Sequence, residues 1–188
     1  MYGKYDFYDL KGIIEGVLSR LGITVSLRPE SGIPTFHPGR TAVMYVNDDC
    51  IGIYGEASPK TLDNYNLGNR VYLAELDVDK LLQYKDTARK YEALPKYPSM
   101  VRDIAVTVKD DILAGSMIEA VEAISPYLIE NVELFDVYKG EHIEEGYKSC
   151  AFSVTYRNRE HTLKEKEVEN VHNKILNMLE KKFDAKLR

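Results

Sequence analysis

The feature that most constrains this sequence is the stretch YKSCAFSVTYR at residues 147–157. Large apolar side chains alternate there with small or hydroxylated ones. Because successive side chains of a β-strand point to opposite faces, the pattern predicts a strand with one face on a core and the other lined by small residues. The large residues are Cys150, Phe152, Val154 and Tyr156, and the small ones are Ser149, Ala151, Ser153 and Thr155.

The segments around this strand complete a recognisable order of elements. RDIAVTVK alternates in the same way and predicts a first strand, and a capping box, TLKE, predicts the start of a second helix. The helical stripes are Leu113, Met117, Val121 and Ile124 in the first helix, and Val168, Val171, Ile175 and Met178 in the second. With DAKLR as a last edge strand the order is β-α-β-β-α-β, a ferredoxin-like unit with two helices on one face of a four-stranded antiparallel sheet.

The second strand of this unit, predicted from Ile129 to Tyr138, changes face partway. Its apolar positions are first Val132 and Leu134 and then, with the opposite parity, Phe135 and Val137. A slip of this kind indicates a β-bulge or a local twist that turns a residue outward.

After the slip, Asp136 and Tyr138 are expected to point away from the core. With Ala105 and Ser149 they would line the uncovered side of the sheet, which we call the open face. A ring that stacks, a carboxylate that accepts hydrogen bonds and small neighbours suit a flat polar ligand. A strand that simply runs out into a polar hairpin is the alternative, and folds of this type also serve as small-molecule sensors or dimerisation units.

The first half of the chain predicts a second unit that ends near residue 90. DFYDLKGIIEGVLSRLG indicates an amphipathic helix between an Asp6 N-cap and a Gly22 stop, followed by four strand-like runs, a hairpin at residues 47–49 and a short helix at 79–84. The helical residues expected to face the core are Phe7, Leu10, Ile13, Ile14, Val17, Leu18 and Leu21.

Several chemistries have little support in the sequence. No nucleophile–base pair, phosphate-binding loop or metal-ligand cluster is apparent, so we expect no catalytic residue, metal or cofactor in this chain. HPGR reads as a loop in which His37 and Arg40 are anchors. The other histidines are expected to be solvent-facing or capping residues: His142, His161 and His172.

Composition limits the disulfide, membrane and RNA-binding properties that this chain can be expected to have. The cysteines, Cys50 and Cys150, lie in strand-like sequence without a CxxC motif, so they are expected to be buried, reduced thiols that form no disulfide. No apolar run suits a membrane span or a signal peptide, so we expect a cytoplasmic protein with no membrane partner. The formal net charge of −5 argues against binding RNA mainly through phosphates. Any RNA contact would be local and dominated by bases.

Three stretches, YPSMVRDIAVTV, IENVELFDVYKGEHIEEGYKSCAFSVTYRNREHTLKEKEV and DAKLR, closely resemble the ferredoxin-fold anticodon-binding domain of bacterial phenylalanyl-tRNA synthetase beta subunits. Upstream, YDFYDLKGIIEGVL, HPGRTAVMYV, IGIYGEASP and VYLAELDVDKLL resemble the end of the catalytic-like module that precedes that domain. The resemblance implies that residues 1–90 are the C-terminal part of a degenerate class II synthetase-like module, with a partial antiparallel sheet and a helix. It implies that residues 91–188 are the anticodon-binding domain.

The resemblance also implies a function. The holoenzyme would be a heterotetramer that charges tRNA(Phe) with phenylalanine using ATP and Mg²⁺ in the alpha subunit, while this chain does no chemistry. The residues that match the family's anticodon contacts are Ala105, Asp136, Tyr138 and Ser149. The basic residues expected to flank that face, as phosphate contacts or merely as solvated charges, are Arg102, Lys148 and Arg157. A protein-interaction or small-molecule regulatory module without RNA binding stays open as the alternative.

Overall fold

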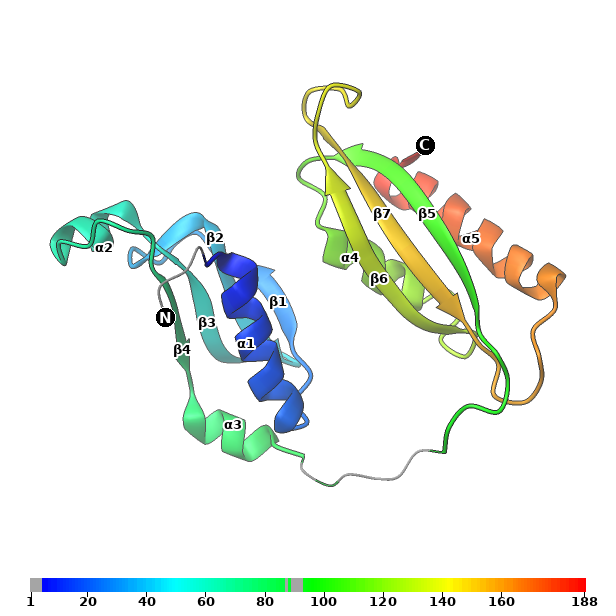
Figure 1. Cartoon of the computed structure of the whole chain (residues 1–188), viewed down its shortest axis with the longest axis horizontal. Coiled ribbons are helices and arrows are strands. Elements are labelled where there is room, and N and C mark those ends of the chain that lie inside the picture. The colour runs from blue at the N-terminus through cyan, green and yellow to red at the C-terminus, as the bar shows by residue number, and fades with distance from the viewer. Residues whose placement is uncertain (1–4, 87, 89–92) are drawn as a thin grey trace. The chain divides into compact units, whose positions relative to one another are not determined.

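The computed structural model of the chain describes residues 5–86, 88 and 93–188. The chain divides into two compact units, residues 1–91 and 92–188. Each unit has its own four-stranded antiparallel sheet and its own helices (Figure 1). The α+β class predicted from the sequence is confirmed.

The sheet of the first unit runs in chain order, β1-β2-β3-β4. Its elements are α1 (Phe7–Arg20), β1 (Ser26–Pro29), β2 (Phe36–Val46), β3 (Asp49–Ala57), α2 (Pro59–Asn64), β4 (Tyr72–Leu76) and α3 (Val78–Tyr84). Asp6 caps α1 as predicted, because its Oδ1 accepts hydrogen bonds from the backbone N–H groups of Tyr8 and Asp9. Gly22, with φ near +70°, follows the end of the helix in the left-handed conformation that glycine favours.

Helix α1 buries fewer of its apolar side chains against the sheet than its sequence predicts. Ile14 and Leu18 are buried in the core of this unit. Ile13 is 64% exposed and Val17 is also exposed, so the prediction that both face the core was wrong. The apolar residues span more of the helix circumference than one sheet can cover.

Two local features of the first unit differ from the prediction. Residues 37–40, HPGR, lie inside β2 and not in a loop, because an irregular pairing between Phe36 and Thr41 accommodates them within the strand. Helix α2 was missed. Its signal is Ser58 followed by Pro59, an N-cap residue and a proline at the first helical position.

The second unit has the predicted β-α-β-β-α-β order and the sheet order β6-β7-β5-β8. Helices α4 and α5 lie on the same face of this sheet (Figure 1). The elements are β5 (Met100–Lys109), α4 (Ala114–Glu122), β6 (Ile129–Tyr138), β7 (Tyr147–Tyr156), α5 (Glu165–Phe183) and β8 (Lys186–Leu187).

The core of the second unit contains the inward residues that the alternation predicted. From the strands they are Ile104, Val106, Val108, Cys150, Phe152, Val154 and Tyr156. Leu113 was expected in the stripe of the first helix, but it precedes α4 and is exposed. Since this core covers one face of β5 and β7, their small residues are left on the other.

Helix α5 begins later than the TLKE motif predicted. The helix starts at Glu165, and Glu167 accepts a hydrogen bond from the backbone N–H of Lys164 at 2.9 Å. His161 Nε2 lies 3.0 Å from the same carboxylate. These two contacts, with the backbone N–H first, lower the pKa of Glu167. Glu167 therefore completes the capping box at the start of the helix, and not Glu165 as the motif predicted.

Cysteine and histidine placements correct two further predictions. Both cysteines are free, and Cys150 is buried, which raises the pKa of its thiol, but Cys50 is exposed. His172 is part-buried and not solvent-facing, with Nδ1 3.1 Å from the hydroxyl of the buried Tyr156. Burial lowers the pKa of His172 and raises the pKa of Tyr156 to about 12. Within the described residues, no helix combines the length and apolar character that crossing a membrane requires.

Candidate nucleic-acid interface

The residues predicted for the open face come together in two neighbouring rows across three strands. In the first row Asp136 pairs with Ala151, which pairs with Ala105. In the second row Tyr138 pairs with Ser149. Since strands lie about 4.8 Å apart and alternate residues about 7 Å apart, these side chains fall within a patch of about 10 Å by 7 Å.

A bulge in β6 sets which of its side chains reach this patch. Leu134 pairs with Phe152, but the next residue in register is Asp136, so Phe135 is an extra residue in the strand. The predicted slip is therefore confirmed. Its predicted effect on Phe135 was wrong, because this side chain is 56% exposed and takes no inward position. The bulge absorbs the change of parity, and from Asp136 onward the strand again alternates in step with β7.

Asp136 and Tyr138 are accessible and suited to contact a ligand. Tyr138 is 39% exposed, and Asp136 is exposed as well. Among the described residues, the carboxylate of Asp136 has no hydrogen-bond or ion-pair partner, so its acceptor oxygens are available. Ser149 is only 6% exposed, so little of its hydroxyl can meet a ligand unless the neighbouring side chains move.

The three basic residues predicted to flank the open face are placed otherwise. Arg102 pairs with Val154 and Lys148 with Val108, so both point to the helix-covered face of the sheet. Arg102 there forms an ion pair with Glu165. Arg157 is engaged inside the unit: its Nε lies 2.8 Å and 2.9 Å from the Glu130 carboxylate oxygens, and its guanidinium donates to the Tyr97 carbonyl at 2.6 Å.

Other basic side chains lie next to the patch and were missed. Lys186 of β8 pairs with Thr107 and so continues the second row. The backbone N–H of Arg188 donates to the Ala105 carbonyl at 3.1 Å, and its guanidinium carbon lies 5.9 Å from the centre of the Tyr138 ring. The signal was present, since DAKLR was predicted as an edge strand, but its register against β5 was not deduced.

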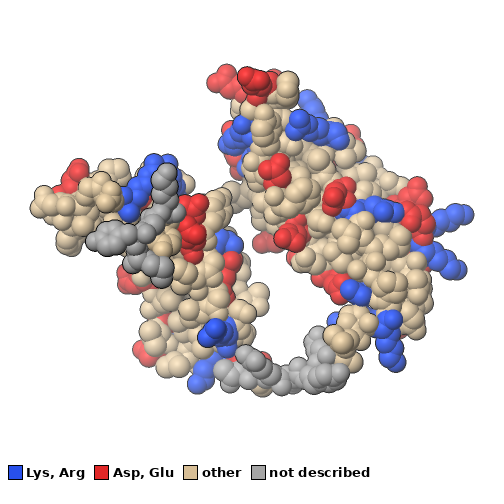
Figure 2. Space-filling model, viewed as in Figure 1, with Lys and Arg blue, Asp and Glu red and all other residues tan. Residues whose placement is uncertain are grey.

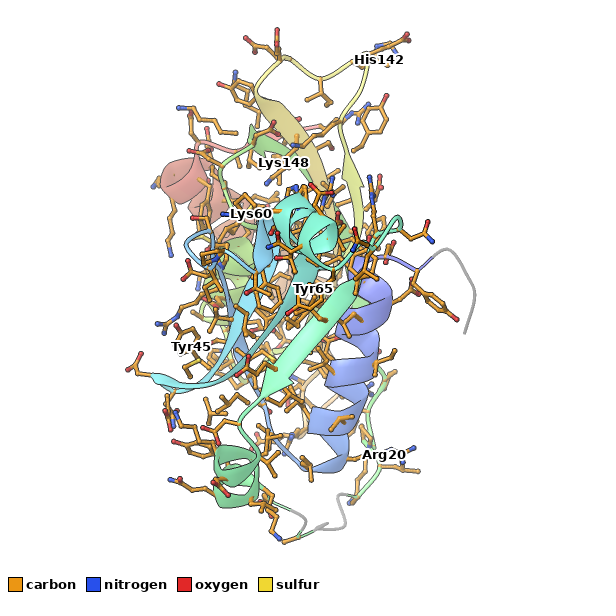
Figure 3. The ribbon with its side chains drawn as sticks, turned by 90° about the vertical axis from the view of Figure 1, so that its left-hand side faces the viewer. Arg20, Tyr45, Lys60, Tyr65, His142 and Lys148 are labelled. Atoms are coloured by element: carbon orange, nitrogen blue, oxygen red, sulfur yellow. The ribbon has the colours of Figure 1, made fainter. Side chains whose placement is uncertain are left out.

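Charges of both signs are interspersed on this side of the second unit, and neither sign forms a continuous patch (Figure 2). The loop between β6 and β7 adds the acidic residues Glu141, Glu144 and Glu145. His142 lies near the tip of that loop, as predicted for a solvent-facing residue (Figure 3). Phosphate attraction is therefore weak here, and base contacts must supply much of any affinity for RNA.

In the part of the chain that the structure describes, no three His, Cys, Asp or Glu side chains are grouped so that they could hold a metal ion. The His37–Arg40 segment is held structurally: Arg40 Nη1 lies 2.9 Å from both carboxylate oxygens of the buried Glu56. The arrangement on the open face can bind a flat polar group, and nothing in it resembles a reaction centre.

Comparison with known proteins identifies both units. Residues 95–188 match the model of the ferredoxin-fold anticodon binding domain, which covers half of the chain. The chain belongs to this family. Residues 2–78 match the phenylalanyl tRNA synthetase beta chain CLM domain.

Similar full-length relatives agree with this assignment. The chain is 42% identical to the phenylalanine–tRNA ligase beta subunit of Clostridium acetobutylicum and 44% identical to that of Clostridium tetani, over its whole length and 24% of theirs. It is 40% identical to the Bacillus subtilis subunit over 97% of the chain and 23% of the relative. The resemblance predicted from the sequence is confirmed, and the chain spans about a quarter of the length of these relatives.

Proposed function

We propose that this chain recognises the anticodon of tRNA(Phe) with the open face of its second unit and thereby supports phenylalanylation by a phenylalanine–tRNA ligase. The observation that carries the proposal is the convergence of Ala105, Asp136, Tyr138 and Ser149 on one uncovered sheet face, in a domain of an anticodon-binding family. Three of the four strands of the sheet are needed to bring them together.

In the proposed recognition each residue has a distinct task. Tyr138 stacks on an anticodon base, since every base has a π-face that a ring can cover. The Asp136 carboxylate accepts hydrogen bonds from the donor edge of a guanine-type base. Ser149 reads a neighbouring base once the side chains that cover it move, and the small Ala105, whose carbonyl oxygen already accepts from Arg188, leaves room for the bases. Binding energy gained there positions the distant acceptor end of the tRNA for the reaction.

The proposal extends to the rest of the enzyme. Residues 1–90 are assigned to the end of the catalytic-like module, with a packing role, and residues 91–188 to the anticodon-binding domain. The alpha subunit would bind ATP and Mg²⁺ and carry out the chemistry in a cytoplasmic heterotetramer. This chain would contribute recognition and scaffold only. Of the three predicted basic contacts, Arg157, Arg102 and Lys148, none is needed for the base contacts proposed.

A titration of the purified chain with a tRNA(Phe) anticodon stem-loop at two salt concentrations tests this function. We expect weak binding with a shallow salt dependence, because few phosphates are neutralised. Stem-loops with a changed anticodon should bind less well. Equal affinity for every anticodon, or a slope that corresponds to about six or more phosphate contacts, would contradict the proposal.

A protein-interaction or small-molecule regulatory module is the second candidate, and the net charge of −5 favours it. The same titration distinguishes the two functions, because such a module would bind no stem-loop at either salt concentration. Mixing the chain with the alpha subunit in analytical ultracentrifugation would then show whether its role is subunit association alone.

A further inference from the structure

Gly140 lies two residues after Tyr138, and because it has no side chain, the Tyr138 ring can occupy the space beside it. A Cβ atom built at Gly140 would stand 2.2 Å from the Tyr138 hydroxyl oxygen and 2.5 Å from the ring carbon that carries it. Real Cβ atoms do not approach other heavy atoms this closely, so the far end of the ring occupies the volume that any other residue at position 140 would fill. The ring therefore leans along the strand direction toward the loop.

This contact has a geometric cause in the end of β6. Tyr138 is the last residue of the strand, and Gly140 begins the turn in which the N–H of Ile143 donates to the Gly140 carbonyl at 2.9 Å. Residues two apart in an extended chain lie about 7 Å from each other, which a tyrosine side chain can span. A side chain at position 140 would push the ring back toward Asp136, which is two residues earlier on the same face.

The opposite constraint on the ring comes from Arg188, whose guanidinium carbon lies 5.9 Å from the ring centre. This distance is within the range of a cation–π contact. Gly140 leaves space for the ring on the loop side, and Arg188, the residue after β8, attracts it. The ring is thus held by groups from two segments that are far apart in the sequence.

We propose that Gly140 is a positioning residue for anticodon recognition: it presets the Tyr138 ring for stacking and keeps the Asp136 carboxylate uncovered. This inference rests on the proposed function of the open face. Gly140 would make no contact with RNA itself and would act through Tyr138. Its φ angle does not lie in the left-handed region, so alanine at this position meets the ring and not a strained backbone.

The test compares Gly140→Ala, Tyr138→Ala and the double variant in stem-loop binding by the full chain. Gly140→Ala should weaken binding by about tenfold, part of the loss caused by removing a stacking ring. Because Gly140 acts through the ring, the double variant should bind like Tyr138→Ala alone. If the two losses multiply in the double variant, Gly140 acts independently of the ring and the inference is wrong.

Two controls separate ring position from folding. Gly115→Ala, in α4, also adds a methyl group, but its Cβ would meet nothing within 4 Å, so binding and melting temperature should stay close to those of the parent. Gly140→Ala should also melt near the parent temperature, because only the flexible end of one exposed side chain must move. A large drop in its melting temperature would show that Gly140 is structural and would overturn the inference.

A measurement without RNA keeps the inference testable apart from the proposed function. In chain labelled with ¹³C at tyrosine rings, Gly140→Ala should shift the Tyr138 ring signals and leave those of the distant Tyr127 unchanged. Unchanged Tyr138 signals would refute the positioning role. Shifted signals together with no stem-loop binding by the parent chain would instead refute the function of the open face.

Discussion

Both sheets of this chain have four antiparallel strands, but they differ in whether other protein groups occupy the oxygens of their carboxylates. In the first unit the buried Glu56 is held by Arg40 at 2.9 Å, by Arg70 at 3.7 Å and by the Tyr72 hydroxyl at 3.3 Å. On the open face of the second unit, Asp136 has no such partner among the described residues. A carboxylate whose oxygens are occupied by the protein holds a fold together, whereas one with unoccupied oxygens is available for a ligand.

The first unit has a second example of an occupied carboxylate. Asp49 accepts hydrogen bonds from Lys80 at 2.6 Å and from the Tyr84 hydroxyl at 3.0 Å, which join the start of β3 to α3. The hydrogen bond from Lys80, followed by that from Tyr84, lowers the pKa of Asp49. If the comparison is right, variants in the first unit change stability, and variants on the open face change RNA binding.

The largest expected effect is on stability and comes from Arg40→Ala. This change removes the nitrogen that makes the closest contact with both oxygens of a buried carboxylate, so we expect the free energy of unfolding to fall by about 2 kcal/mol. Urea unfolding followed by circular dichroism measures it. The matched control is Arg28→Ala, which breaks an exposed pair with Asp48 and a contact with the Tyr45 ring and should cost at most about 1 kcal/mol. Equal effects of the two variants would contradict the structural role of the Glu56 group.

Tyr138→Ala should have the opposite signature. Loss of a stacking ring should remove about 1–3 kcal/mol of stem-loop binding and leave the melting temperature almost unchanged, because the ring supports no core. Fluorescence anisotropy with a labelled stem-loop gives the affinity. Tyr127→Ala, a highly exposed tyrosine outside the open face, is the control and should bind like the parent. A variant that mainly lost stability would show that Tyr138 is a structural residue.

Asp136→Asn tests the readout itself with a smaller expected loss, about 1 kcal/mol of stem-loop binding. The change keeps the shape of the side chain but replaces one acceptor oxygen with a donor that faces the base's own donors. Charging of tRNA(Phe) by the intact synthetase should fall, and tRNA-independent activation of phenylalanine should stay normal. Glu119→Gln, which changes an exposed carboxylate of α4 on the helix-covered side of the sheet, is the control and should charge like the parent. Normal charging by Asp136→Asn would refute the readout.

The smallest effect concerns pH. Burial and then Arg102 lower the pKa of His172 in the folded chain below 6.5. At a pH between the His172 pKa of the folded chain and that of the unfolded chain, the unfolded chain binds more protons. The free energy of unfolding should therefore decrease as the pH falls below about 6.5 toward the His172 pKa of the folded chain. His172→Gln should flatten this part of the profile of urea midpoint against pH, without altering stem-loop binding. An unchanged profile would assign the pH dependence to other groups.

Much of the second unit could be predicted because its strands alternate strictly. Period-two alternation is a local property, and it placed Ala105 and Ser149 on the open face without any knowledge of their neighbours. The same rule, applied strictly, would have excluded Arg102, which shares parity with the inward residue Ile104. The resemblance to the family drew attention to basic residues that the alternation places on the covered face.

The errors arose where an outcome depends on contacts between distant segments. The sequence of β6 indicates a bulge, but whether Phe135 or a neighbour is the extra residue depends on the register with β7. The position of Arg188 beside Tyr138 likewise depends on how β8 pairs with β5. The exposure of Ile13 depends on how much of α1 the first sheet covers. No local pattern contains this information.

The bulge at Phe135 has a consequence for how this domain can vary. The ladder passes from the pair Leu134–Phe152 directly to the pair Asp136–Ala151, so Phe135 stands outside the register that assigns side chains to the two faces of the sheet. Substitution at position 135 changes one exposed side chain. Deletion of that residue would remove the bulge and leave a regular ladder, in which the Asp136 carboxylate keeps its place on the open face. Position 135 can therefore vary in identity, and even be lost, without turning the later side chains of β6 over.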